Sequence, residues 1–107
     1  MKYIIHNEQF SKKSDITNRC REIVKESEYK DVDKKHYAFI LDLFKSHPHY
    51  TYKRLYDVKR LFVKRNPQYK TFSLFVELND GTIDDASYME CIKSIQPNFN
   101  TQLLNNR

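Results

Sequence analysis

The chain contains three groups of residues of the types that catalyse reactions or hold metals: four histidines, two cysteines and one pair of adjacent aspartates. His47-Pro48-His49, together with His6 and His36, is the grouping that a metal site would use. A structural zinc site, however, takes four ligands in closely spaced pairs, and no cysteine pair is present. We therefore expect capping or surface histidines, and no metal.

The cysteines and the aspartates have simpler explanations than catalysis. Cys20 and Cys91 both fall on apolar stripes with helical spacing, where cysteine usually serves as a small buried apolar residue. Adjacent residues of a strand point to opposite faces, so Asp84 and Asp85 do not readily share one cation, and Asp85 is expected to cap the last helix. No nucleophile elbow or catalytic triad is recognisable. The sequence predicts a protein that is not an enzyme and uses no cofactor.

Positive charge is concentrated in residues 50–70, here called the basic segment. The whole chain holds 19 Lys and Arg against 14 Asp and Glu, a net charge of +5, whereas the basic segment holds seven cations and only Asp57, a net charge of +6. Such concentration attracts polyanions, although a solvated strand that uses lysines to protect its edge would have the same composition.

Tyrosines alternate with these cations. Cations neutralise phosphates, while aromatic faces stack on unpaired bases, and Tyr56 and Tyr69 belong to the same pattern unless they only cover the edge of the core. We therefore predict nucleic-acid binding, with RNA preferred over DNA. The candidate binding residues are Tyr50, Tyr52, Lys53, Arg54, Lys59, Arg60, Lys64, Arg65 and Lys70.

Two helices are predicted in the first half of the chain, after a short strand at Tyr3-Ile4-Ile5. Ser14 or Ser11 is expected to cap the first helix, with Asp15 in its opening turn. Its buried stripe is Ile16, Cys20, Ile23 and Val24. Asp33 is expected to cap a second, central helix that stops at His47-Pro48. Its apolar positions are Tyr37, Phe39, Ile40, Leu41, Leu43 and Phe44.

A small antiparallel meander and a last helix are predicted in the second half. Val58, Leu61 and Val63 are the inward residues of one strand, and their spacing indicates a bulge. A turn at residues 66–69 leads to the strand 72–78, and Gly81 allows a tight turn before a short return at residues 82–84. The last helix carries the apolar positions Tyr88, Cys91, Ile92 and Ile95.

The expected fold class is α+β, with the helices packed on one face of the small sheet. With 107 residues the chain fits a single domain, whose core spans about residues 10–95 and is followed by a polar tail at 96–107. No apolar run is long enough to cross a bilayer, no secretory signal is evident, and two cysteines do not form a disulfide framework. We expect a soluble, cytoplasmic protein with no membrane partner.

Several short motifs occur together in a familiar order. They are Phe10-Ser11-Lys12-Lys13, Leu41-x-Leu43, His47-Pro48, Asp80-Gly81-Thr82, Asp85-x-Ser87-Tyr88 and Cys91-Ile92. Over residues 10–93 this order resembles the DCL-type domain, named from the plant Defective Chloroplasts and Leaves protein, in a stand-alone bacterial or phage version. The resemblance implies a role around RNA, in processing or transcription, and no catalytic mechanism. Leu55 and Asp57 stand where the family often has glycine, and Ala86 replaces an aromatic residue.

A protein partner is the alternative interpretation. Small basic proteins encoded by phages or bacteria often bind and modulate a host protein such as the transcription machinery, and an acidic partner would be attracted by the same charge. Such an interface needs aromatic anchors, for which Tyr50, Tyr52 and Phe62 are candidates.

Overall fold

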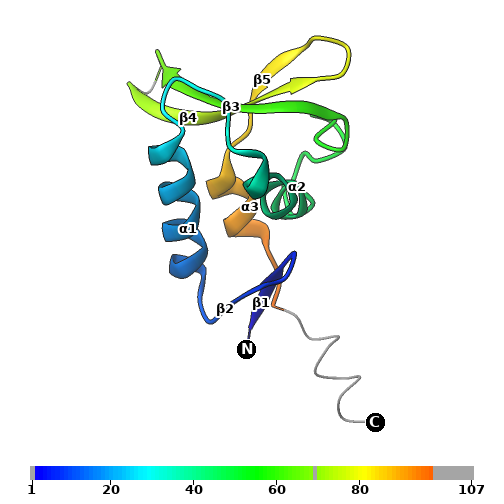
Figure 1. The fold of residues 1–107 in the computed structure, drawn as a ribbon. Helices are drawn as coiled ribbons and strands as arrows, with labels where there is room; N and C mark the ends of the chain where they lie inside the picture. Colours follow the sequence, from blue (N-terminus) through cyan, green and yellow to red (C-terminus); the bar gives the residue numbers. More distant parts are fainter. Residues whose placement is uncertain (1, 69, 98–107) are drawn as a thin grey trace.

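The chain folds into three α-helices and two antiparallel sheets, shown in the computed structural model of Figure 1. The structure describes residues 2–68 and 70–97, so Tyr69 and the tail from residue 98 lie outside the description. The elements in chain order are β1 (Tyr3–Ile5), β2 (Glu8–Phe10), α1 (Lys13–Glu26), a 3-10 turn η1 (Lys34–His36), α2 (Tyr37–Phe44), β3 (Val58–Asn66), β4 (Thr71–Leu78), β5 (Ile83–Asp85) and α3 (Tyr88–Ser94). The predicted α+β class is confirmed.

The three-stranded sheet has the order β3–β4–β5 and provides one wall of the core. Its register shifts between Val58 and Arg60, which confirms the predicted bulge, and Gly81 has the positive φ of 90° expected in the turn between β4 and β5. Leu61 and Val63 are buried in the same core cluster as the apolar residues of the helices. Figure 1 shows the helices together on one side of this sheet.

The predicted helical stripes form the other wall. Ile16, Cys20, Ile23 and Val24 are all buried on α1, as their spacing indicates. The cap was predicted wrongly: α1 begins after Lys12, which has an extended backbone and makes no side-chain cap, so that Ser14 already lies inside the first turn. Asp33 does cap, but it caps η1, where its carboxylate accepts a hydrogen bond from the Lys35 N–H at 3.0 Å.

The N-terminal hairpin was only half predicted. The strand at Tyr3–Ile5 is confirmed, but it pairs with β2, a strand of three residues that was not predicted. Ile5 is 1% exposed, and the Phe10 ring contacts the Phe39 ring of α2 at a centroid distance of 5.9 Å. This hairpin lies at the end of the helices opposite the three-stranded sheet (Figure 1).

The start of α3 also differs from expectation. Ser87 caps this helix, because its hydroxyl accepts a hydrogen bond from the Glu90 N–H at 3.3 Å. Asp85, the expected cap, is instead the last residue of β5. Within residues 2–68 and 70–97, no helix has both the length and the apolar character needed to cross a membrane.

Candidate nucleic-acid interface

Lys53 and Arg54 of the basic segment bind carboxylates of the β4–β5 region. Lys53 Nζ lies 3.4 Å from Asp85 Oδ1 and 3.7 Å from Asp84 Oδ2, and Arg54 Nη1 lies 2.8 Å from Asp80 Oδ2. Burial raises the pKa of Asp85, but the attraction of Lys53 and hydrogen bonds outweigh it, so that the pKa lies below its ordinary value. These two cations attach the loop after α2 to the sheet and are already neutralised.

Hydrogen bonds within the β4–β5 turn lower the pKa of Asp80 as well. Its carboxylate accepts a hydrogen bond from the Thr82 N–H at 2.9 Å. Hydrogen bonds from Thr82, followed by that from Arg54, lower the pKa of Asp80 to about 2. Asp80 therefore stays ionised at neutral pH as the partner of Arg54.

Arg60 is held on the outer face of the sheet. Its Nε lies 2.8 Å from Glu77 Oε1, its Nη1 lies 2.7 Å from Asp31 Oδ1, and its guanidinium lies 4.2 Å from the centre of the Phe62 ring. The hydrogen bonds that Arg60 donates to Glu77 and then to Asp31 raise the pKa of Arg60, and the first of these lowers the pKa of Glu77. Arg60 thus joins β3, β4 and the segment before η1 instead of offering a free charge.

The nine predicted binding residues therefore do not form one surface. Alternation along β3 places Arg60 and Lys64 on the outer face with Phe62, whereas Arg65 points to the other side. Lys59 is exposed but lies near the start of the strand, beside the bulge. Most cations of the basic segment instead lie in two regions, one paired with carboxylates and one at the far end of the β3–β4 hairpin.

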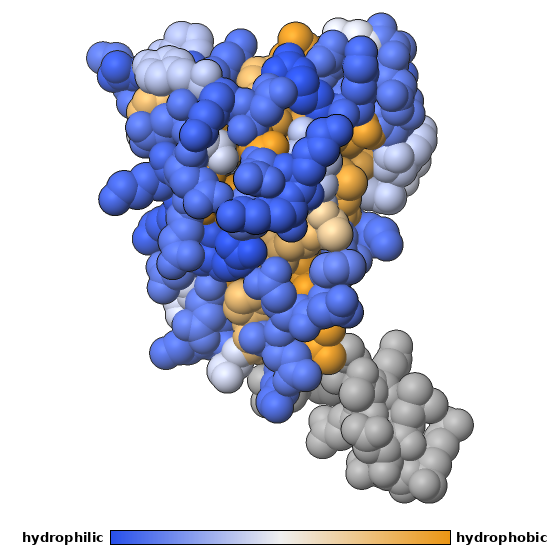
Figure 2. Space-filling model, viewed as in Figure 1, coloured by the Kyte–Doolittle hydropathy of each residue, from blue (hydrophilic) through white to orange (hydrophobic). Residues whose placement is uncertain are grey.

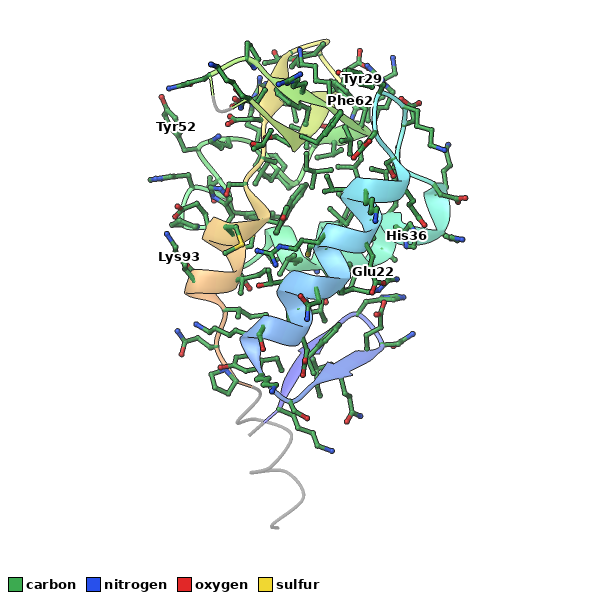
Figure 3. All side chains as sticks on the ribbon, turned by 90° about the vertical axis from the view of Figure 1, so that its left-hand side faces the viewer. Glu22, Tyr29, His36, Tyr52, Phe62 and Lys93 are labelled. Atoms are coloured by element: carbon green, nitrogen blue, oxygen red, sulfur yellow. The ribbon has the colours of Figure 1, made fainter. Side chains whose placement is uncertain are left out.

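The predicted tyrosines are also divided. Tyr50 is half-buried against the core and meets Tyr56 edge-on at 6.0 Å, whereas Tyr52 is 88% exposed. Figure 3 shows Tyr52 on one side of the molecule and Tyr29 with Phe62 on the other, so Tyr52 is separate from the hairpin end. The structure does not describe Tyr69.

Four exposed cations surround the hairpin end, with Lys64 on the outer face of the sheet and Arg65 on the other face, and are called the basic end: Lys30, Lys64, Arg65 and Lys70. Lys30 reaches this place because its C=O accepts a hydrogen bond from the Val63 N–H at 3.0 Å, which aligns the segment after α1 with β3. Among the residues that the structure describes, no carboxylate lies within 4.0 Å of these four cationic groups, and Glu28 is the nearby acidic residue on the same segment. The basic end thus retains a net charge of +3 after Glu28 is subtracted from four cations.

Aromatic rings accompany the basic end. Tyr29 is 69% exposed, and its ring meets Phe72 edge-on at 5.0 Å. Lys64 Nζ lies 4.7 Å from the centre of the Phe75 ring, which in turn stacks on Phe62 at 5.7 Å. Figure 2 shows mainly hydrophilic side chains over the surface in view, with an apolar seam running down between the helices. Tyr29 and Lys30 were not predicted as site residues, since nothing local to them indicates that they lie beside residues 63–72.

Two of the four histidines, His36 and His47, are buried, whereas capping or surface positions were expected; His6 and His49 are exposed. His36 is 6% exposed; its Nδ1 accepts a hydrogen bond from Arg19 Nη2 at 3.2 Å, so its Nε2–H donates to Glu26 Oε1 at 2.6 Å. His47 is equally buried, its Nδ1 accepts a hydrogen bond from the His49 N–H at 2.9 Å, and burial, followed by the nearby Lys53, lowers its pKa. No group of three potential metal ligands is found in residues 2–68 and 70–97.

The cysteines lie on two different helices and are part of the core. Both are buried, Cys20 on α1 and Cys91 on α3. Burial raises the pKa of each thiol to about 12, so neither is ionised near neutral pH. Their placement confirms the interpretation of both residues as part of the core.

Comparison with known proteins gives a family and a fold. The family described as "Protein of unknown function (DUF3223)" matches residues 21–92. No curated protein matches. The solution NMR structure of an uncharacterized protein from Rhodospirillum rubrum is similar, with a TM-score of 0.71 and 24% sequence identity over 82% of this chain and 85% of that one. At this identity the likeness shows the fold alone.

The family match corrects the resemblance drawn from the short motifs. The expected DCL-type domain is not the family that the chain matches, and the role in RNA that the resemblance implied has no support from these comparisons. The motifs themselves have structural explanations: Gly81 forms the turn, Ser87 caps α3, and Cys91 and Ile92 are buried. Residues of these types recur in any fold that needs such a turn, cap or buried helix, so their order is weak evidence for one family.

Proposed function

The chain belongs to the DUF3223 family, a description that assigns no activity, and from its surface we propose that it binds RNA without catalysing a reaction. The observation that carries this proposal is the basic end, where Lys30, Lys64, Arg65 and Lys70 gather without carboxylate partners among the described residues. Cations that are not neutralised by the protein remain able to replace the counterions of phosphates.

The contrast with the other cations strengthens this choice. Lys53, Arg54 and Arg60 each lie within 4.0 Å of at least one carboxylate, so binding a phosphate there would require breaking an ion pair of the fold. Binding a phosphate at Lys64 or Lys70 breaks no ion pair among the described residues. Phosphates are therefore expected at the hairpin end, and not along the whole basic segment.

Tyr29 supplies a second element of recognition. Its exposed ring contacts Phe72 edge-on, so it presents an aromatic face to solvent beside the cations. Stacking on such a face requires an unpaired base, and single-stranded RNA loops and ends are the usual source of such bases. Cations beside an aromatic face suit a single strand better than a duplex.

Charge reversal tests the proposal. The variant Lys64→Glu/Lys70→Glu is expected to weaken binding of a single-stranded RNA octamer at least roughly tenfold, because two attractive charges become repulsive. Fluorescence anisotropy measures the affinity, and thermal unfolding checks that the fold is kept.

The matched control is Lys2→Glu/Lys12→Glu. It changes the net charge equally but lies at the opposite end of the molecule, beside the β1–β2 hairpin (Figure 1). Equal losses in the two variants would mean that only net charge matters, and unaltered affinity in Lys64→Glu/Lys70→Glu would refute the proposed surface.

A further inference from the structure

Strand β4 is longer than its partner β5, and this leaves part of its edge open. β5 pairs with residues 75–77 only, and the last contact on this side is the hydrogen bond from the Ala86 N–H to the Leu74 C=O at 3.0 Å. Because backbone groups alternate in direction along a strand, Phe72 has its N–H and C=O on the same side as Leu74, away from β3. Within residues 2–68 and 70–97, the backbone of Phe72 and the N–H of Leu74 have no hydrogen-bond partner on this side.

A groove follows this open edge and is called the edge groove. Its volume is about 220 Å³, and it separates β4 from the first turn of α3. Its lining includes Asn66, Phe72, Ser73, Ser87, Tyr88 and Met89. Apolar and aromatic side chains thus lie beside backbone donors and acceptors that have no partner in the described part of the chain.

The edge groove adjoins the basic end. Asn66 and Thr71 line it and are the chain neighbours of Arg65 and Lys70. A strand of RNA whose phosphates contact these cations therefore has its bases within reach of the groove.

We propose that the edge groove accepts one unpaired nucleobase of single-stranded RNA, an inference that rests on the proposed function. The free N–H and C=O of Phe72 match the adjacent acceptor and donor groups on the edge of a base, and the rings of Phe72 and Tyr88 with Met89 provide apolar contact. The groove is smaller than the roughly 300–1,000 Å³ of sites for drug-sized ligands, which suits a single planar ring system.

An extended peptide fits the same place less well. Addition of a strand gains its affinity from a row of main-chain hydrogen bonds. Among the residues that the structure describes, the two groups of Phe72 and the N–H of Leu74 are available along this edge before Ala86 closes it. The neighbouring Arg65 and Lys70 also favour a ligand that carries phosphates.

Ser73→Ile is the variant that tests the groove. Ser73 lines the groove, its side chain makes no hydrogen bond to the described residues, and isoleucine is a better strand residue, so the fold is expected to persist while the groove is narrowed. The control is Ser11→Ile, the same substitution at an exposed serine ahead of α1. Tyr29 and all four cations of the basic end remain in both variants.

The probes are a mixed-sequence single-stranded RNA octamer and the same octamer without bases. Wild type and Ser11→Ile are expected to bind the complete octamer roughly tenfold or more tightly than the abasic one. Ser73→Ile is expected to lose at least about threefold of this preference and to keep its affinity for the abasic octamer, because the variant keeps all four cations, including Lys64 directly opposite position 73 on β3. In ¹H–¹⁵N NMR spectra of the wild type, the complete octamer shifts the amide signals of Phe72 and Leu74, and the abasic octamer leaves them in place.

Each failure has a different meaning. Equal affinity of the wild type for both octamers, an unchanged preference in Ser73→Ile, or unmoved Phe72 and Leu74 amides would overturn the edge groove and leave RNA binding by the basic end intact. Absence of binding to either octamer would overturn the proposed function and this inference together. If Ser73→Ile does not fold, the amide shifts of Phe72 and Leu74 in the wild type show whether a base occupies the edge groove.

Discussion

The number of phosphates that the basic end engages can be counted from the salt dependence of binding. Four cations, Lys30, Lys64, Arg65 and Lys70, are available there. For single strands each neutralised phosphate contributes about −0.7 to the slope of log affinity against log salt, so four contacts predict a slope of about −2.8. Raising the salt from roughly 50 to 200 mM should then weaken binding about 50-fold.

Neutralising two of these cations should halve the salt dependence of binding. In Lys64→Gln/Lys70→Gln the slope should fall to about −1.4, and the same salt change should weaken binding only about sevenfold. Lys2→Gln/Lys12→Gln removes the same charge at the opposite end and should keep the wild-type slope. The assay is fluorescence anisotropy with a single-stranded RNA octamer at four or more salt concentrations.

The comparison of slopes is more informative than one affinity. A wild-type slope near −5 would mean that the cations of the ion pairs also contact phosphates, so that Lys53, Arg54 and Arg60 leave their carboxylates on binding. Equal slopes for Lys64→Gln/Lys70→Gln and the wild type would refute the assignment of phosphates to the basic end.

Three further predictions concern the fold. Arg60→Glu places a third carboxylate beside Asp31 and Glu77 and removes the cation from Phe62, so we expect the melting temperature to fall by roughly 5–10 °C, whereas a reversal at an unpaired surface cation leaves it nearly unchanged. His36→Ala removes the buried centre of an arginine–histidine–glutamate network and should cost about 2–3 kcal/mol in urea unfolding; a loss below about 0.5 kcal/mol would contradict the hydrogen bonds described. Burial lowers the pKa of His47 below its ordinary 6.5, so the unfolded chain binds a proton at a higher pH than the folded chain does. The free energy of unfolding should therefore fall as the pH drops below 6.5 and stay level above it. His47→Asn should weaken this pH dependence.

Local patterns in the sequence predicted most of the elements. The helical stripe of Ile16, Cys20, Ile23 and Val24 and the turn at Gly81 depend only on residues close together in the chain, and all are as expected. The missed elements are those whose local signal is weak. β2 has three residues and exists because it pairs with β1, and the α1 cap at Lys12 has no capping side chain to reveal it.

The family assignment shows the same limit. Short motifs such as Asp80-Gly81-Thr82 report a turn and a cap, which many unrelated chains need, and the resemblance built on their order was wrong. Periodicity specifies which residues are buried, but it does not specify which family uses them.

The sequence alone determined the apolar faces, the buried cysteines and the excess of positive charge, because composition and periodicity are properties of the chain itself. Only the tertiary structure decided which cations remain available. Arg60 meets Asp31 across 29 positions and Lys53 meets Asp85 across 32, while Lys30 joins Lys64 through pairing between distant segments. Charge acts through distance in space, and folding sets these distances between residues whose spacing in the sequence carries no record of them.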